Sequence, residues 1–137
     1  MGRATYFACF AASSFVAPVF AAPFAYYCDY EVGVAANISE GLGVQTDIST
    51  DDEFSLQFVV EANEQDGTMI GNAGASNVVA IWGKQKVTFI EVTANGTVQS
   101  TVVYGEGFGT FASAHSRTTG GPGYEMPSQY YGFCDVR

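Results

Sequence analysis

His115 is the only histidine in the chain, and it is the first residue to consider for acid–base chemistry because imidazole titrates near neutral pH. Ser113 and Ser116 lie beside it. On an alternating strand, residues one or two positions apart cannot form a nucleophile–base pair by themselves, and the chain has no nucleophile-elbow motif. We therefore expect His115 to lie on the surface or at a rim, and we assign no catalytic residue.

Two acidic clusters contain the oxygen ligands that Ca²⁺ prefers. The candidate ligands are Asp47, Asp51, Asp52, Glu61, Asn63 and Asp66. In the second cluster, Asp66 stands where an EF-hand loop needs a glycine. We therefore interpret both clusters as solvated loops, and we expect no bound metal and no cofactor.

Three tyrosines near the end of the chain, Tyr124, Tyr130 and Tyr131, form a third candidate site. Tyrosine has an apolar ring and a polar tip, so such a group can line a carbohydrate-binding or protein-binding face. The same residue type also fills the core of small β domains. Both interpretations remain open at this stage.

The first residues have the layout of a secretory signal peptide, with one basic residue, Arg3, followed by an apolar run and small residues. The small-residue rule places cleavage after Ala21, with Ala25 as the latest alternative. We therefore expect a signal peptide over residues 1–21 and a single β domain over residues 22–137, in the periplasm or secreted.

The cysteines support the same compartment. Cys9 would leave with the signal peptide, so Cys28 and Cys134 remain, and in an oxidising compartment two remaining cysteines most simply pair. Neither Cys9 nor Cys28 follows a lipoprotein tetrad, so we expect no lipid anchor and no membrane anchor.

The formal net charge of −9 limits the choice of partners. Such acidity argues against binding to nucleic acid or to an anionic membrane surface. An unknown protein or a small ligand remains as the expected partner.

The most regular stretch, residues 86–104, has two β-rich runs about Asn95-Gly96, the strongest short hairpin signal. A two-residue loop would bury Glu91 among apolar groups, which is costly. A three-residue loop, with Gly96 left-handed in a bulge, leaves Glu91 in water, and we expect this register. The core-facing residues would then be Ile90, Val92 and Val98.

Short β-rich runs separated by turn signals occupy the rest of the chain, and no stretch has a helical period. Alternation is clearest over Phe54 to Val60. Further strands are expected near residues 26–34, 78–82, 108–117 and 129–134, and loops over 37–52 and 118–128. The pattern predicts an all-β, antiparallel single domain, either a small barrel or a sandwich, with one terminal disulfide.

Several short motifs carry a resemblance to known proteins. They are Gly71-Asn72-Ala73-Gly74, Thr88-Phe89-Ile90-Glu91-Val92-Thr93, Ser116-Arg117 and the closing Pro127-Ser128-Gln129-Tyr130-Tyr131-Gly132-x-Cys134. In these features the C-terminal half resembles a group of small exported, uncharacterised alphaproteobacterial proteins. Members usually have Ser-Arg-His-Thr where this chain has Ser116-Arg117-Thr118-Thr119, so the histidine has moved to His115. The resemblance implies bacterial export and a terminal disulfide, and it implies no activity.

A looser analogy is to the periplasmic lysozyme inhibitors of the small β-barrel type, which place a Ser-Gly-x-x-Tyr loop in the lysozyme cleft. Gly120-Gly121-Pro122-Gly123-Tyr124 has that spacing but lacks the serine.

Together these features predict a non-enzymatic binding or interaction module of the periplasm or the secreted fraction. A lysozyme-inhibitor-like protein is the alternative, followed by a small hydrolase that uses His115. The position of His115 discriminates between the first and the last, because a pocket shared with a carboxylate and a hydroxyl would favour the enzyme.

Overall fold

The computed structural model describes residues 24–39, 43–49, 53–61, 65–121 and 124–137, and every regular element in them is a β-strand. In chain order the strands are β1 (Phe24–Ser39), β2 (Gly43–Ser49), β3 (Phe54–Val60), β4 (Asp66–Gly71), β5 (Gly74–Gly83), β6 (Lys86–Val92), β7 (Val98–Tyr104), β8 (Gly109–Gly121) and β9 (Tyr124–Val136). The expected signal peptide, residues 1–21, lies outside the described residues. The described part of the chain contains no helix of the length and apolar character needed to cross a membrane.

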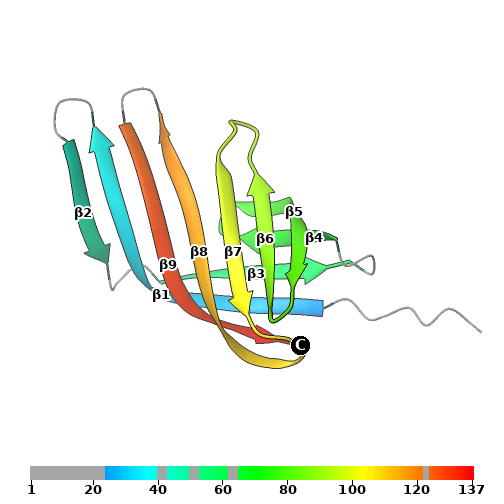
Figure 1. Ribbon diagram of the computed structural model, residues 1–137. Coiled ribbons are helices and arrows are strands. Elements are labelled where there is room, and N and C mark those ends of the chain that lie inside the picture. The colour runs from blue at the N-terminus through cyan, green and yellow to red at the C-terminus, as the bar shows by residue number, and fades with distance from the viewer. Residues whose placement is uncertain (1–23, 40–42, 50–52, 62–64, 122–123) are drawn as a thin grey trace, which may run out of the picture.

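All strand pairs are antiparallel, and the sheet closes on itself. The order is β2-β1-β3-β4-β5-β6-β7-β8-β9, and β1 also pairs with β9. The strands β1 and β3 to β9 therefore form an eight-stranded barrel, and β2 is an additional strand at its side (Figure 1). The predicted all-β class is confirmed, and of the two predicted architectures the protein adopts the barrel.

The seam between β1 and β9 contains the predicted disulfide. Cys28 and Cys134 are directly opposite each other in the register and are bonded, so the predicted pairing is confirmed. Gly132 lies in the same seam, where a Cβ would come within 1.9 Å of the backbone oxygen of Asp29. A glycine is therefore required for the two strands to approach this closely.

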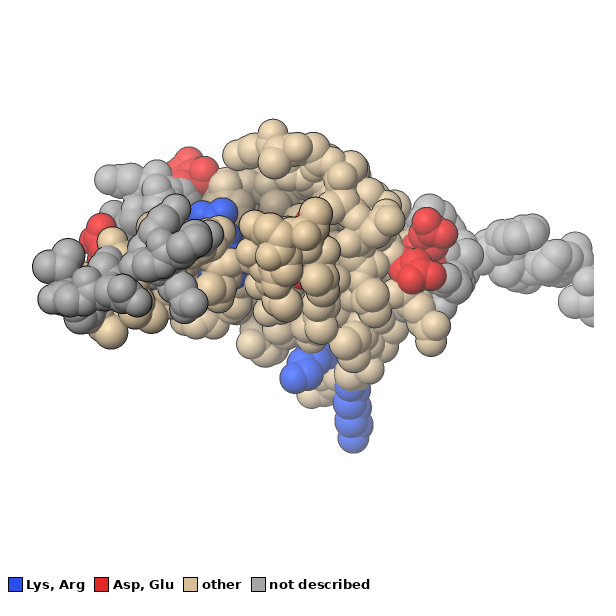
Figure 2. Space-filling model, turned by 90° about the horizontal axis from the view of Figure 1, so that it is seen from above, with Lys and Arg blue, Asp and Glu red and all other residues tan. Residues whose placement is uncertain are grey.

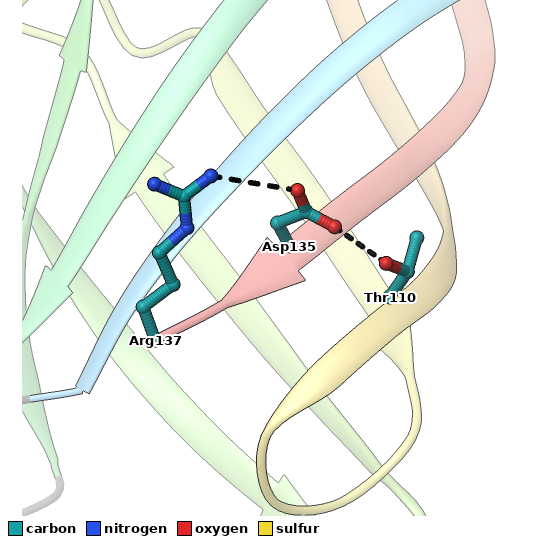
Figure 3. Close-up of polar contacts among 3 residues, drawn as sticks. All are labelled: Thr110, Asp135 and Arg137. Atoms are coloured by element: carbon teal, nitrogen blue, oxygen red, sulfur yellow. Dashed lines mark hydrogen bonds and ion pairs between the residues drawn. The ribbon is translucent and has the colours of Figure 1, made fainter.

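Polar contacts hold the last residues of the chain beside this seam (Figure 3). The backbone N–H groups of Ala25 and Arg137 each donate to the carbonyl oxygen of the other at 3.0 Å. Asp135 accepts a hydrogen bond of 2.5 Å from Thr110 Oγ1 and pairs with Arg137 at 3.6 Å. The ion pair is exposed and contributes at most about 1 kcal/mol, so the backbone pairs are the main attachment.

A bulge in β1 reverses the direction of its later side chains. Tyr26, Cys28 and Tyr30 point into the barrel, but the register shifts between Tyr30 and Val32. Val32 is therefore half exposed on the outside, although simple alternation predicts that it faces inward.

Beyond the bulge, the strands continue past the barrel as a small sheet, which we call the extension. In the extension, residues 33–39 of β1 lie between β2 and β9, and residues 118–121 of β8 pair with β9 alone (Figure 1). The predicted loops over 37–52 and 118–128 are therefore largely wrong. These segments lack apolar alternation because no core covers the extension, and pairing between strands keeps them extended instead.

The hairpin of β6 and β7 has the predicted register, but the face predicted to lie in water is the one that turns into the barrel. Val92 faces Val98, and Gly96 is left-handed with φ of 85°, as the three-residue loop requires. Glu91, however, is 8% exposed and points into the barrel, whereas Val92 is 67% exposed. The prediction that Glu91 lies in water is wrong, because the barrel interior is polar at this level.

The apolar core fills the opposite half of the barrel. Phe58 and Phe89 stack with their ring centroids 4.4 Å apart, and Tyr26 meets Phe89 edge-on at 5.1 Å. Leu56, Phe58 and Val60 are buried as the alternation of β3 predicted, so that strand prediction is confirmed. Buried apolar side chains therefore pack this half of the barrel.

Replacing both Cys28 and Cys134 with alanine should lower the free energy of unfolding by about 4–5 kcal/mol, because the bond closes a loop of 106 residues in the unfolded chain. Urea denaturation of the variant and of the oxidised protein measures this difference. A loss below about 1 kcal/mol would show that β1 and β9 hold the barrel closed without the disulfide.

Candidate functional site

At the end of the barrel opposite the packed core lies a cavity of about 570 Å³, which we call the cup. It is open on one side, and residues of every strand from β3 to β9 line it. Its apolar lining includes Phe54, Leu56 and Met69, and its ionisable lining includes Glu91, His115 and Arg117. The cup thus combines an apolar wall with a few polar groups, as small-molecule sites do.

The inward side chains of β6 mark the boundary between core and cup. Val87 and Phe89 are each 1% exposed and belong to the core, and the next inward residue is Glu91. Successive inward positions are about 7 Å apart along a strand, so the interior becomes polar within one step. Inward residues of β8 follow the same trend, from Phe111 to His115.

Glu91 has a carboxyl oxygen, Oε2, that is buried and has no hydrogen-bond partner. It is the only such side-chain atom in the part of the chain that the structure describes. A buried polar atom without a partner costs about 1–3 kcal/mol. Such a group in a folded protein calls for a physical explanation, and a ligand that donates a hydrogen bond to it is one.

His115 is 2% exposed and lines the cup, so the prediction of a surface or rim histidine is wrong. Strand alternation places it correctly on the face of β8 that also holds Phe111 and Ser113, but that face turns into the barrel. Its ring lies 5.7 Å from the Phe54 ring and 6.3 Å from the Tyr130 ring.

A chain of buried hydroxyl groups lies beside His115. Ser113 donates to the Val102 carbonyl at 3.0 Å, so Tyr30, 2.9 Å away, must donate to Ser113. His115 Nδ1 lies 2.8 Å from the Thr101 hydroxyl and shares a hydrogen bond with it.

Burial keeps His115 neutral. It lowers the pKa of His115 to about 4, and the positive charge of Arg117 adds to this effect. Burial also raises the pKa of Tyr30 to about 12, although its hydrogen bonds to Ser113 and Thr101 act in the opposite direction. At neutral pH the whole chain of hydroxyls and the imidazole is therefore uncharged.

Arg117 is the cation of the cup. Its Nε donates to Ser128 Oγ at 3.3 Å and its Nη2 donates to the Tyr130 hydroxyl at 2.8 Å. Its guanidinium carbon lies 5.0 Å from the centre of the Tyr130 ring and 5.9 Å from that of Phe54. These contacts hold the guanidinium against aromatic faces and turn it toward β9.

The tyrosines Tyr130 and Tyr131 do not share one binding face. Tyr130 is buried over Gly33, where a Cβ would lie 2.6 Å from the ring, and it contributes to the cup. Tyr131 is exposed on the outer face, beside a hollow of about 440 Å³. The side chain of Tyr124 lies outside the described residues.

The calcium candidates are dispersed. Asp47 is exposed on β2, and Glu61 and Asp66 are exposed near the turn between β3 and β4. Asp51, Asp52 and Asn63 lie outside the described residues. Within the described ranges, no three acidic, histidine or cysteine residues are close enough to bind a metal ion.

The Gly120-to-Tyr124 stretch compared with lysozyme inhibitors lies where the β8–β9 hairpin turns. Residues 122 and 123 of this turn are outside the described part of the chain. The described strand ends on either side of it, Gly121 and Tyr124, pair with each other in the extension and do not line the cup.

The sequence alone did not identify Glu91, Gln99 and Arg117 as one group. The register places Gln99 opposite both Glu91 on β6 and Arg117 on β8, so the three residues form one row across the barrel wall. The predicted hairpin register already contained the first of these pairs. The missing information was which face of the hairpin turns inward.

Figure 2 shows the molecule from above, and in this view the charged side chains of the described residues form a few small, separate groups on a mostly uncharged surface. No protein-family model matches this chain, and no curated protein is significantly similar to it.

The free energy of unfolding should depend on pH through His115. The unfolded chain takes up a proton near pH 6.5 and the folded protein only near pH 4, so stability is complete above pH 6.5 and falls as the pH is lowered toward 4. The loss should be on the order of 3 kcal/mol. Urea titrations of wild type and of His115→Gln across this range isolate it, and equal slopes for both proteins would contradict the buried neutral imidazole.

Glu91→Met should stabilise the ligand-free protein by about 1–3 kcal/mol, because it replaces an unpartnered buried carboxyl with an apolar side chain of similar length. The matched control is Glu106→Met at an exposed turn residue, which should change stability by less than about 0.5 kcal/mol. Destabilisation by Glu91→Met alone would mean that the carboxyl has partners within the fold.

Proposed function

We propose that this protein is an exported, non-enzymatic β-barrel that binds a small molecule in the cup. The observation that carries the proposal is that Glu91 lines an open cavity and that one of its carboxyl oxygens, Oε2, is buried without a hydrogen-bond partner. A ligand that donates a hydrogen bond to Oε2 would remove this cost, and binding would then be favoured.

The dimensions of the cup support a ligand of modest size. Small-molecule sites typically measure about 300–1,000 Å³, and the cup, at about 570 Å³, is within that range. Eight-stranded barrels are just wide enough for side chains or one small ligand in the interior. Here side chains fill one half, and the other half is available.

The proposed location, the periplasm or the secreted fraction, rests on the signal-peptide layout of residues 1–21 and on the disulfide. Disulfides persist in oxidising compartments and are rare in the cytosol. The bond also joins the strands that close the barrel, so the cup would keep its shape outside the cell.

Acid–base catalysis by His115 is a second candidate function, because this residue shares the cup with the Glu91 carboxyl and the Tyr130 hydroxyl. It ranks second because Nδ1 of His115 is hydrogen-bonded to Thr101 and not to a carboxylate. Thr101 is itself 1% exposed, so a substrate could not reach its hydroxyl. A triad-like relay would need a carboxylate at Nδ1 and an accessible nucleophile.

Saturation-transfer NMR with a library of small fragments tests whether the cup binds ligands. Ser76 lines the cup, so Ser76→Phe should occlude it and abolish the signals of fragments that bind there. Asn77→Phe adds the same ring at the next, exposed residue of β5 and should leave these signals unchanged.

Thermal melts of both variants establish that they are folded. If no fragment binds wild type, or if Ser76→Phe and Asn77→Phe bind the same fragments equally, the proposal is wrong. Turnover of a substrate that His115→Gln abolishes would instead support the catalytic candidate.

A further inference from the structure

The cup contains an acidic side chain, Glu91, and a basic side chain, Arg117, which are not paired with each other. Both line the cavity, and Gln99 lies between them in the same row. Adjacent strands are about 4.8 Å apart, so the backbones of Glu91 and Arg117 are separated by roughly 10 Å. The ion pair of Arg137 with Asp135 involves neither residue.

The contacts of each group keep this separation. Arg117 is turned toward β9 by its hydrogen bonds to Ser128 and Tyr130, away from β6. Two of its five N–H donors are used in these bonds, so others remain for a ligand. On β6, Glu91 Oε2 has no donor.

Apolar side chains form part of the wall of the same cavity, namely those of Phe54, Leu56 and Met69. His115, which also lines it, is neutral. A second carboxyl residue, Glu53, lies at the exposed rim. The cup therefore has one buried acidic group, Glu91, and one basic group, Arg117, on different strands, with apolar side chains in the same cavity wall.

We propose that the cup binds a small zwitterion with separated charges, whose cationic nitrogen meets Glu91, whose anionic group meets Arg117, and whose hydrocarbon chain lies along Phe54, Leu56 and Met69. Charge-assisted hydrogen bonds at both ends would satisfy the Glu91 oxygen and provide Arg117 with an anionic partner. A ligand with only one of these charges would leave one group uncompensated. This inference rests on the proposed function and names its ligand class.

Isothermal titration calorimetry with four probes tests the inference. The probes are 6-aminohexanoate, hexylamine, hexanoate and L-norleucine, which is an isomer of 6-aminohexanoate with adjacent charges. Wild type should bind 6-aminohexanoate on the order of tenfold more tightly than each of the other three, as expected for one additional charge-assisted contact.

Glu91→Gln nearly preserves the shape of the side chain, and it should reduce the affinity for 6-aminohexanoate to about that of wild type for hexanoate. The matched control is Glu106→Gln, which removes the same charge at an exposed residue that does not line the cup and should have little effect. An equal loss in both variants would show general attraction by acidic charge, and this would overturn the assignment of Glu91.

The two proposals can fail separately. If fragments bind the cup but 6-aminohexanoate binds no better than hexylamine or hexanoate, or if L-norleucine binds more tightly, the zwitterion inference is wrong and the ligand-binding function stands. If no fragment binds the cup, both are wrong.

Discussion

Closure of β1 against β9 is the constraint on which the rest of the structure depends. These strands come from the two ends of the described domain, and their pairing turns an open sheet into a barrel. The disulfide fixes the register there, and Gly132 allows the backbones to approach. Without closure the row of Glu91, Gln99 and Arg117 would lie on an open sheet, and the cup would not exist.

The two halves of the barrel interior affect the stability of the fold in opposite ways. In one half, stacked aromatic rings such as Phe58 and Phe89 bury apolar area and stabilise the fold. In the other half, Glu91 lacks a partner for one oxygen, which lowers stability, and burial holds His115 neutral, which lowers stability only as the pH falls below about 6.5. Local loss of stability at polar, concave positions is typical of functional sites.

Much of the fold was predictable because it depends on local chemistry. Alternation in β3, the Asn95-Gly96 turn and the two remaining cysteines each predicted a feature that the structure confirms. The cup was not predictable in the same way. The rule that carboxyl groups face water orients the hairpin of Glu91 wrongly, because it assumes an interior that is apolar along its whole length.

The extension and the bulge show the limits of alternation in another way. Val32 faces outward only because one extra residue near Glu31 shifts the register, and such a shift has no strong sequence signal. The segments of β1 and β2 in the extension are held by strand pairing without a covering core, so their composition resembles that of loops.

A methyl NMR spectrum of protein labelled with ¹³C-methyl methionine tests the central claim, a ligand site inside one half of the barrel, most directly. Met69 lines the cup, whereas Met126 is exposed on the extension. During titration with the fragment that gives the strongest saturation-transfer signal, the account predicts that the Met69 resonance shifts and saturates while the Met126 resonance stays in place. An unchanged Met69 resonance together with a shifting Met126 resonance would contradict it.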